Sequence, residues 1–148
     1  MTGTSHEPIQ ILLVEDSASD AELTIDALRS ARVLNAVHRV CDGVEALAYL
    51  RRQGEYATAT RPDLILLDLN LPRMNGYELL EVIKQDDSFA LIPVVVLTTS
   101  HADRDILRSY QLRANCYVSK PVALQEFLDV VQETGNFWLQ LVRLPPAR

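Results

Sequence analysis

The chain has 148 residues, of which 48% are hydrophobic and 23% charged, and its formal net charge is −6. This length suits one compact domain that buries its own core. The acidic balance, with a pI near 5.0, argues against nucleic acid or an anionic membrane as a partner. No basic region precedes an apolar stretch near residue 1, and no apolar run is long enough to span a bilayer, so we expect a cytoplasmic protein.

The first predicted elements are a strand and a helix. Ile9–Val14 is an almost unbroken run of apolar residues, which is typical of a parallel strand buried on both faces. A helix follows, because Ser17 and Asp20 form a candidate capping box and apolar residues then recur with a helical period. These apolar residues are Ala21, Ile25 and Leu28.

The second strand is less apolar than the first. Val37–Cys41 mixes polar and apolar residues, so we expect it near an edge of the sheet. The helix after it begins close to Asp42 and Gly43, and three apolar residues are expected to point inward from it. These are Val44, Leu47 and Leu50. Gln53–Pro62 then makes a long connection, for which a solvated loop is the usual structure.

The third and fourth strands are again strongly apolar. Leu64–Leu67 and Ile92–Leu97 are short runs rich in Ile, Leu and Val, so both suit the buried centre of a parallel sheet. Between them, Asn75 is placed to cap a helix. This helix carries Leu79, Leu80 and Ile83 on its inner side.

The last predicted elements complete the alternation of strands and helices. A helix is expected over Asp103–Gln111, and the mixed segment Asn115–Ser119 predicts a strand near an edge of the sheet. The final helix opens near Pro121 and ends at Gly135. The residues that these two helices would bury are Ile106, Leu107, Tyr110, Leu124, Phe127, Leu128 and Val131.

Five units of strand and helix predict a doubly wound α/β fold, with a five-stranded parallel sheet in the order 2-1-3-4-5 and helices on both faces. The predicted domain covers residues 8–135, and residues 136–148 form a C-terminal extension. Sheets of this kind bind ligands beyond the carboxyl ends of their strands, where the strand order reverses. A functional site is therefore expected at that edge.

Five polar residues follow the predicted strands at this edge: Glu15, Asp16, Asp68, Thr98 and Lys120. Each has an ordinary explanation when taken alone, since a carboxylate after a strand is usually a helix cap and a lysine before proline is usually solvated. Their gathering at one edge favours a site instead. Clustered carboxylates repel one another and are tolerated around a divalent cation such as Mg²⁺, and an aspartate among them can form an acyl phosphate.

The strand ends carry the motifs of a known family. These are ILLVEDS, PDLILLDLNLPRMNGYELL, IPVVVLTTS and ANCYVSKP, in this order along the chain. The sequence resembles the receiver domains of bacterial response regulators, which are phosphorylated in two-component systems, over residues 8–135. This resemblance implies the flavodoxin-like receiver fold. It also implies a signalling protein that assists its own phosphorylation and dephosphorylation and converts no outside substrate.

The resemblance further implies a role for each residue at the strand ends. Asp68 is expected to accept the phosphoryl group, and Thr98 and Lys120 are expected to contact it. The expected ligands of Mg²⁺, or of Mn²⁺, are Glu15, Asp16, Asp68 and the backbone carbonyl of Asn70. On phosphorylation, Thr98 and Tyr117 are expected to move and to change the surface formed by the fourth helix, fifth strand and fifth helix.

Two residues depart from the usual family pattern. Glu15 stands where many relatives have aspartate, and its longer side chain is expected to reach the metal through a water molecule. Thr99 follows Thr98 where alanine or glycine is frequent, and its bulk is expected to restrict the water that hydrolyses the phosphoryl bond. We therefore expect phospho-Asp68 to persist longer in the wild type than in a Thr99→Ala variant, and an equal or slower loss of phosphate from the variant would contradict this.

The segment NFWLQLVRLPPAR after Gly135 lies beyond an ordinary receiver domain. Its apolar residues either fold back over the core of the same chain or cross to a second subunit. Stand-alone receivers with such a Phe-Trp-Leu segment resemble the regulators of bacterial phytochrome kinases. This resemblance implies a homodimer with Phe137, Trp138 and Leu139 at the interface, and a phytochrome-type sensor histidine kinase as partner.

Two other functions compete with this interpretation. A phosphohydrolase of the haloacid-dehalogenase type would carry an acid two residues after its nucleophile, where this chain has Asn70. A degenerate receiver would bind partners without phosphorylation, but such a domain is expected to have lost Asp68, an acid of the Glu15–Asp16 pair, or Lys120. Both alternatives are therefore disfavoured.

The two cysteines carry no recognisable chemistry. Cys41 and Cys116 are far apart in the chain and fit no metal-ligand or redox spacing. Each lies within an apolar segment, so both are expected to be buried free thiols.

Overall fold

The computed structural model describes residues 8–29, 35–98 and 116–119, with only the backbone described at Thr98 and over 116–119. Strands and helices alternate there as predicted. In chain order, the elements are β1 (Ile9–Val14), α1 (Ala18–Arg29), β2 (Asn35–Val40), α2 (Gly43–Leu50), the short 3₁₀ helix η1 (Gly54–Tyr56), β3 (Leu64–Leu67), α3 (Gly76–Gln85), β4 (Val94–Thr98) and β5 (Cys116–Ser119). The helices predicted over 103–111 and 121–135 lie outside the described residues.

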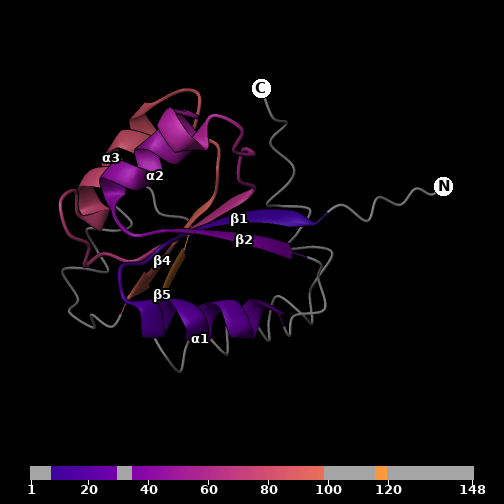
Figure 1. Cartoon of the computed structure of the whole chain (residues 1–148). Helices are drawn as coiled ribbons and strands as arrows, with labels where there is room; N and C mark the ends of the chain where they lie inside the picture. Colours follow the sequence, from indigo (N-terminus) through magenta and orange to yellow (C-terminus); the bar gives the residue numbers. More distant parts are fainter. Residues whose placement is uncertain (1–7, 30–34, 99–115, 120–148) are drawn as a thin grey trace.

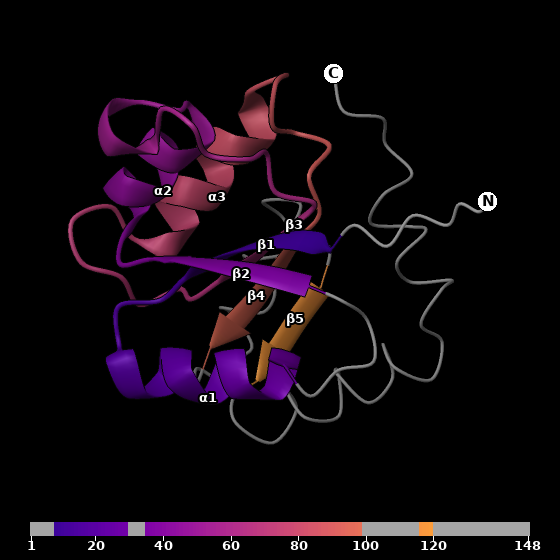
Figure 2. The ribbon, with the colours of Figure 1, turned by 45° about the vertical axis from the view of Figure 1, so that its right-hand side comes forward.

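The five strands are all parallel and lie in the order β2-β1-β3-β4-β5, which confirms the predicted topology. β2 and β5 form the two edges, as their mixed sequences predict. Figures 1 and 2 show α1 on one face of the sheet and α2 with α3 on the other. None of the described helices is long and apolar enough to cross a membrane.

The two faces of the sheet have separate apolar cores. Successive side chains of a strand point to opposite faces, so each central strand contributes to both cores. The core beneath α2 and α3 contains the strand residues Leu12, Val14, Ile65 and Leu67. The core beneath α1 contains the strand residues Ile11, Leu13, Leu64 and Leu66. Burial on both faces explains why β1 and β3 are continuous apolar runs.

Two helices begin at the caps that the sequence predicts. Oδ1 of Asn75 accepts a hydrogen bond from the N–H of Glu78 at 3.0 Å, and Oε1 of Glu78 accepts one from the N–H of Asn75 at 3.0 Å, which completes a capping box for α3. At the start of α1, the hydroxyl of Ser17 accepts from the N–H of Asp20 at 3.3 Å, which is one of the two hydrogen bonds of the predicted capping box. The predicted inner residues of α3 are all buried: Leu79, Leu80 and Ile83.

Two predictions about single side chains are wrong. Val44 is 42% exposed, because Leu47 and Leu50 lie on the buried side of the short helix α2 and Val44 does not. Cys41 is exposed, because it comes directly after β2, the edge strand of the sheet. The side chain of Cys116 lies outside the described residues.

The connection over Gln53–Pro62 is only partly a solvated loop. Most of its residues are exposed, as predicted. It also contains η1, and Tyr56 and Ala59 are partly buried against the core beneath α2 and α3. The ring of Tyr56 lies 5.5 Å from that of Tyr49 in α2, measured between ring centroids. The connection is therefore attached to the domain through Tyr56.

Candidate functional site

Glu15 and Asp68 lie at the carboxyl edge of the sheet, directly after β1 and β3. The N–H of Glu15 donates to the C=O of Val40 at 3.0 Å, and the N–H of Asp68 donates to the C=O of Val14 at 3.0 Å. These bonds continue the pairing of neighbouring strands by one residue. They fix the backbone of both acidic residues at the edge where ligands bind in this kind of sheet.

Three carboxylates meet at this edge. Glu15, Asp16 and Asp68 each offer one oxygen, and these oxygens lie within 4.8 Å of one another. Glu15 is only 1% exposed and Asp68 only 6%, whereas Asp16 is exposed. The structure therefore brings together the three side chains that the sequence predicts as metal ligands.

The chemistry of this cluster fits a divalent cation. Carboxylate oxygens are preferred ligands of Mg²⁺ and Mn²⁺, and a cation among them offsets the mutual repulsion of their charges. Two backbone groups orient the buried carboxylates. The N–H of Ser17 donates to Oε2 of Glu15 at 3.3 Å, and the N–H of Asn70 donates to Oδ1 of Asp68 at 3.1 Å. Glu15 and Asp68 are thus oriented from within the loops that carry them.

The first turn of α3 packs against the backbone of Asp68. A Cβ built on Gly76 would lie 2.5 Å from the carbonyl oxygen of Asp68 and 2.6 Å from Cα of Leu69. The N–H of Gly76 also donates to the C=O of Leu69 at 3.0 Å. A glycine is therefore required here by the close approach of two backbones, and that approach fixes the position of Asp68.

Arg39 in β2 binds the backbone of the acid pair. Its Nε donates to the C=O of Glu15 at 2.9 Å, and its Nη2 donates to the C=O of Asp16 at 3.1 Å. Reasoning from the sequence missed this residue. The one feature that could have indicated its role is its position in β2 beside Leu13 of β1, close to the end of β1 that carries Glu15 and Asp16.

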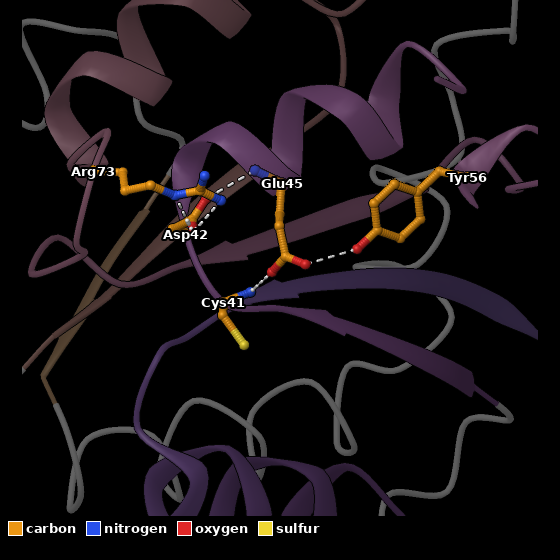
Figure 3. A network of polar contacts seen from close by, with 5 residues as sticks. All are labelled: Cys41, Asp42, Glu45, Tyr56 and Arg73. Atoms are coloured by element: carbon orange, nitrogen blue, oxygen red, sulfur yellow. Dashed lines mark hydrogen bonds and ion pairs between the residues drawn. The ribbon is translucent and has the colours of Figure 1, made fainter. Parts of the chain in front are cut away.

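A network of polar contacts connects η1, α2 and the loop between β3 and α3 (Figure 3). Nε of Arg73, in that loop, donates to Oδ2 of Asp42 at 2.9 Å, and Nη2 of Arg73 forms an ion pair with the same oxygen at 2.7 Å. Oδ1 of Asp42 accepts from the N–H of Glu45 at 2.8 Å and so caps α2. The carboxylate of Glu45 accepts from the N–H of Cys41 at 2.6 Å and from the hydroxyl of Tyr56 at 3.0 Å. The sequence predicted none of the side-chain pairs in this network.

The network shifts two pKa values in opposite directions. Burial favours the neutral form of Asp42, but the N–H of Glu45 and the guanidinium of Arg73 outweigh it and hold the pKa of Asp42 below its usual value. Burial, together with the hydrogen bond to Glu45 and its charge, raises the pKa of Tyr56 to about 12. At neutral pH, Asp42 is therefore an acceptor and Tyr56 a donor, as their contacts require.

The other predicted site residues are placed only in part. Thr98 is the last residue of β4, and its backbone pairs with that of Ser119 in β5, so it lies at the same edge of the sheet as the acids. Tyr117 lies within β5. The predicted residues outside the described part of the chain are Thr99, Lys120, Phe137, Trp138 and Leu139.

Known proteins are similar to this chain in both sequence and fold. Response regulator Rcp1 of Synechocystis sp. is 46% identical over 147 residues, which cover 99% of this chain and 100% of that protein. The crystal structure of the phosphorylated cyanobacterial phytochrome response regulator RcpA is 49% identical and has a TM-score of 0.78, over 90% of this chain and 95% of that one. The Mn²⁺-bound form of Rcp1 has a TM-score of 0.77, over 90% and 96% of the two chains.

The family assignment follows from the fold, the acidic edge and these similarities taken together. Residues 11–132 match the response regulator receiver domain. The matched region contains all of the described strands except the first two residues of β1, and it contains the three clustered carboxylates. The chain therefore belongs to the family of response regulator receiver domains.

Proposed function

We propose that this receiver accepts a phosphoryl group on Asp68 from a sensor histidine kinase and signals through a changed protein-binding surface. One observation carries the proposal: oxygens of Asp68, Glu15 and Asp16 lie within 4.8 Å of one another at the carboxyl edge of the sheet. Asp68 follows β3, the central strand. Its backbone is fixed by Val14 on one side and by Gly76 on the other.

The proposed transfer is a displacement at phosphorus. A carboxylate oxygen of Asp68 attacks the phosphoryl group of a phosphohistidine, so that a phosphorus–oxygen bond forms and the phosphorus–nitrogen bond breaks. The leaving imidazole keeps the electron pair and takes up a proton. The hydroxyl of Thr98 and the ammonium of Lys120 are the proposed partners of the phosphoryl oxygens.

Glu15, Asp16 and Asp68 are the proposed side-chain ligands of Mg²⁺ or Mn²⁺, and the backbone carbonyl of Asn70 is the proposed fourth protein ligand. When bound, the cation neutralises charge on the carboxylates and on the transferred group. The similarity to the Mn²⁺-bound form of Rcp1 supports the binding of a divalent cation.

Phosphorylation is proposed to shift the receiver between two conformations. The added charge on Asp68 favours the state in which Thr98 contacts the phosphoryl group. Tyr117 in β5 then changes position, and the surface on the β5 side of the sheet changes with it. The protein acts as a phosphoacceptor and converts no outside substrate.

The proposed phosphoryl donor is a phytochrome-type histidine kinase, and the proposed assembly is a homodimer. The similarity to RcpA, a cyanobacterial phytochrome response regulator, supports the donor. The apolar character of Phe137, Trp138 and Leu139 in the extension over residues 136–148 supports the dimer.

The proposal is tested by incubating the protein with acetyl phosphate, with and without Mg²⁺, and measuring its intact mass. The wild type is expected to gain a single phosphoryl group that depends on Mg²⁺, and Asp68→Asn is expected to gain none. Asp63→Asn is a matched control, because Asp63 precedes the opposite end of β3 and accepts from the N–H of Gln10 at 2.9 Å. It is expected to react like the wild type.

An unmodified wild-type protein, under conditions that modify another receiver, would contradict the proposal. That result would favour a degenerate receiver, which binds its partners without phosphorylation.

A further inference from the structure

A charged link joins the loop between β3 and α3 to the start of α2. Nε of Arg73 donates to Oδ2 of Asp42 at 2.9 Å, and Nη2 of Arg73 forms an ion pair with the same oxygen at 2.7 Å. The side chain of Asp42 is 9% exposed and that of Arg73 is 58% exposed. The other oxygen of Asp42 accepts from the N–H of Glu45, so this carboxylate is held from two sides (Figure 3). The carboxylate of Asp42 therefore cannot rotate away from Arg73 without breaking the hydrogen bond that caps α2.

The backbone of the same loop also approaches α2 closely. The N–H of Gly43 donates to the C=O of Met74 at 3.2 Å. A Cβ built on Gly43 would lie 2.6 Å from that oxygen and 2.8 Å from Cβ of Met74. The loop is thus fixed by backbone contact at Met74 and by a side-chain link at Arg73, immediately before the helix cap at Asn75.

Arg73 has a backbone conformation that favours glycine. Its φ is 61°, and a residue with a side chain adopts a positive φ only at an energetic cost. Strain of this kind persists where the surrounding contacts determine the conformation. For Arg73 those contacts are the hydrogen bond and the ion pair with Asp42, which also account for an arginine at a position where glycine is less strained.

We infer that Arg73 is a positioning residue for the divalent-cation site at Asp68. It lies in the same short loop as Asn70, whose N–H donates to Asp68 and whose backbone carbonyl is a proposed ligand. Fixing the loop at Arg73 restricts the positions that this carbonyl takes relative to the three carboxylates. The inference deepens the proposed function and rests on it, since it concerns the same site.

Binding of Mn²⁺, followed by the electron paramagnetic resonance signal of the free ion, tests the inference without any phosphorylation. Arg73→Gln removes the charge and is expected to raise the Kd for Mn²⁺ by about tenfold, which is typical when a residue that orients metal ligands is lost. Arg73→Lys keeps the charge and is expected to recover part of the affinity. Arg73→Gly relieves the backbone strain but removes the link, so it is expected to weaken Mn²⁺ binding in a folded protein.

A double variant tests whether Arg73 acts through Asp42. Asp42→Asn alone is expected to weaken Mn²⁺ binding, and Asp42→Asn combined with Arg73→Gln is expected to bind as weakly as the weaker of the two single variants. Such non-additivity identifies two residues that act through one link. Fully additive losses of affinity would overturn this part of the inference.

Arg61→Gln is the matched control, because Nη1 of Arg61 donates to the C=O of Ser88 at 2.6 Å and Arg61 lies before β3, at the opposite end from Asp68. Its Kd for Mn²⁺ is expected to equal that of the wild type. An unchanged Kd in all three Arg73 variants would overturn the inference, even if their melting temperatures fell. A wild type that binds no Mn²⁺ would overturn the proposed metal site and this inference with it, so the two failures are distinguishable.

Discussion

Gly76 lies so close to Asp68 that a Cβ at residue 76 would stand 2.5 Å from the carbonyl oxygen of Asp68. The first residue of α3 is therefore in contact with the backbone of the proposed phosphoacceptor. Both residues belong to rigid parts of the chain, since Gly76 is the first residue of a capped helix and Asp68 continues the pairing of the central strands. A side chain at residue 76 can fit only if one of these elements moves.

Gly76→Ala is expected to lower the free energy of unfolding by about 1–3 kcal/mol, because the added methyl group meets backbone atoms that cannot turn aside. Chemical denaturation measures this change. Gly54→Asn is the control, because nothing lies within 4 Å of a Cβ built there and asparagine tolerates its φ of 60°. Equal stability of Gly76→Ala and the wild type would contradict the close approach.

The sheet and the acid cluster could be predicted from local sequence. β1 and β3 have the predicted bounds, because a strand buried on both faces is apolar throughout and ends where polar residues begin. The meeting of Glu15, Asp16 and Asp68 follows from topology, since the carboxyl ends of parallel strands share one edge.

The contacts that surround the acids could not be predicted in the same way. Arg39 and Arg73 bind partners distant in sequence, and nothing in the residues next to them indicates which segments meet in space. Cys41 is exposed because it follows an edge strand. The exposure of Val44 depends on which side of the short helix α2 faces the sheet. Composition and periodicity describe neither property.

Tyr56→Phe is expected to lower the free energy of unfolding by about 1 kcal/mol, because the hydroxyl donates to the carboxylate of Glu45. The pKa of Tyr56 is raised from 10.0 to about 12, so the folded state binds the phenolic proton more tightly than the unfolded chain. This contribution is complete below pH 10.0 and is lost as the pH rises through about 12.

An absorbance titration of phenolate formation checks the pKa of Tyr56. The difference in phenolate absorbance between the wild type and Tyr56→Phe is expected to have its midpoint at a pH of about 12. Glu45→Gln is expected to lower this midpoint because it removes the neighbouring charge. A midpoint that Glu45→Gln leaves in place would show that the carboxylate does not act on this tyrosine.

Asp42→Asn is expected to lower the free energy of unfolding by about 1–2 kcal/mol at neutral pH, a modest loss because Arg73 is largely in solvent. Folding lowers the pKa of Asp42 from 3.8, so its stabilisation is complete above that value and is lost as the pH falls through the lower folded pKa. The difference between wild type and variant is therefore expected to shrink in acid.

Denaturation at several pH values measures this difference. Asp26→Asn is the control, because within the described part of the chain Asp26 forms only an exposed ion pair with Arg29 at 3.7 Å, and this variant is expected to change stability very little. A difference between wild type and Asp42→Asn that stays constant into strong acid would contradict the role given to the ionised Asp42.

Trp138→Ala is expected to convert a dimer into a monomer, because Trp138 is the largest apolar residue of the proposed dimer arm over residues 136–148. Light scattering coupled to chromatography measures the mass in solution. Leu23→Ala is the control, since Leu23 is an exposed apolar residue of α1. An unchanged mass in the Trp138 variant would remove the main support for the arm.

The most direct measurement is to locate the phosphoryl group within the chain. Borohydride converts an aspartyl phosphate into homoserine, and tryptic cleavage after Arg52 and Arg73 yields one peptide that contains both Asp63 and Asp68. After reaction with acetyl phosphate and Mg²⁺, fragment masses of this peptide are expected to show homoserine at residue 68 and aspartate at residue 63. Homoserine at another residue, or at none, would contradict the assignment of Asp68 as the phosphoacceptor.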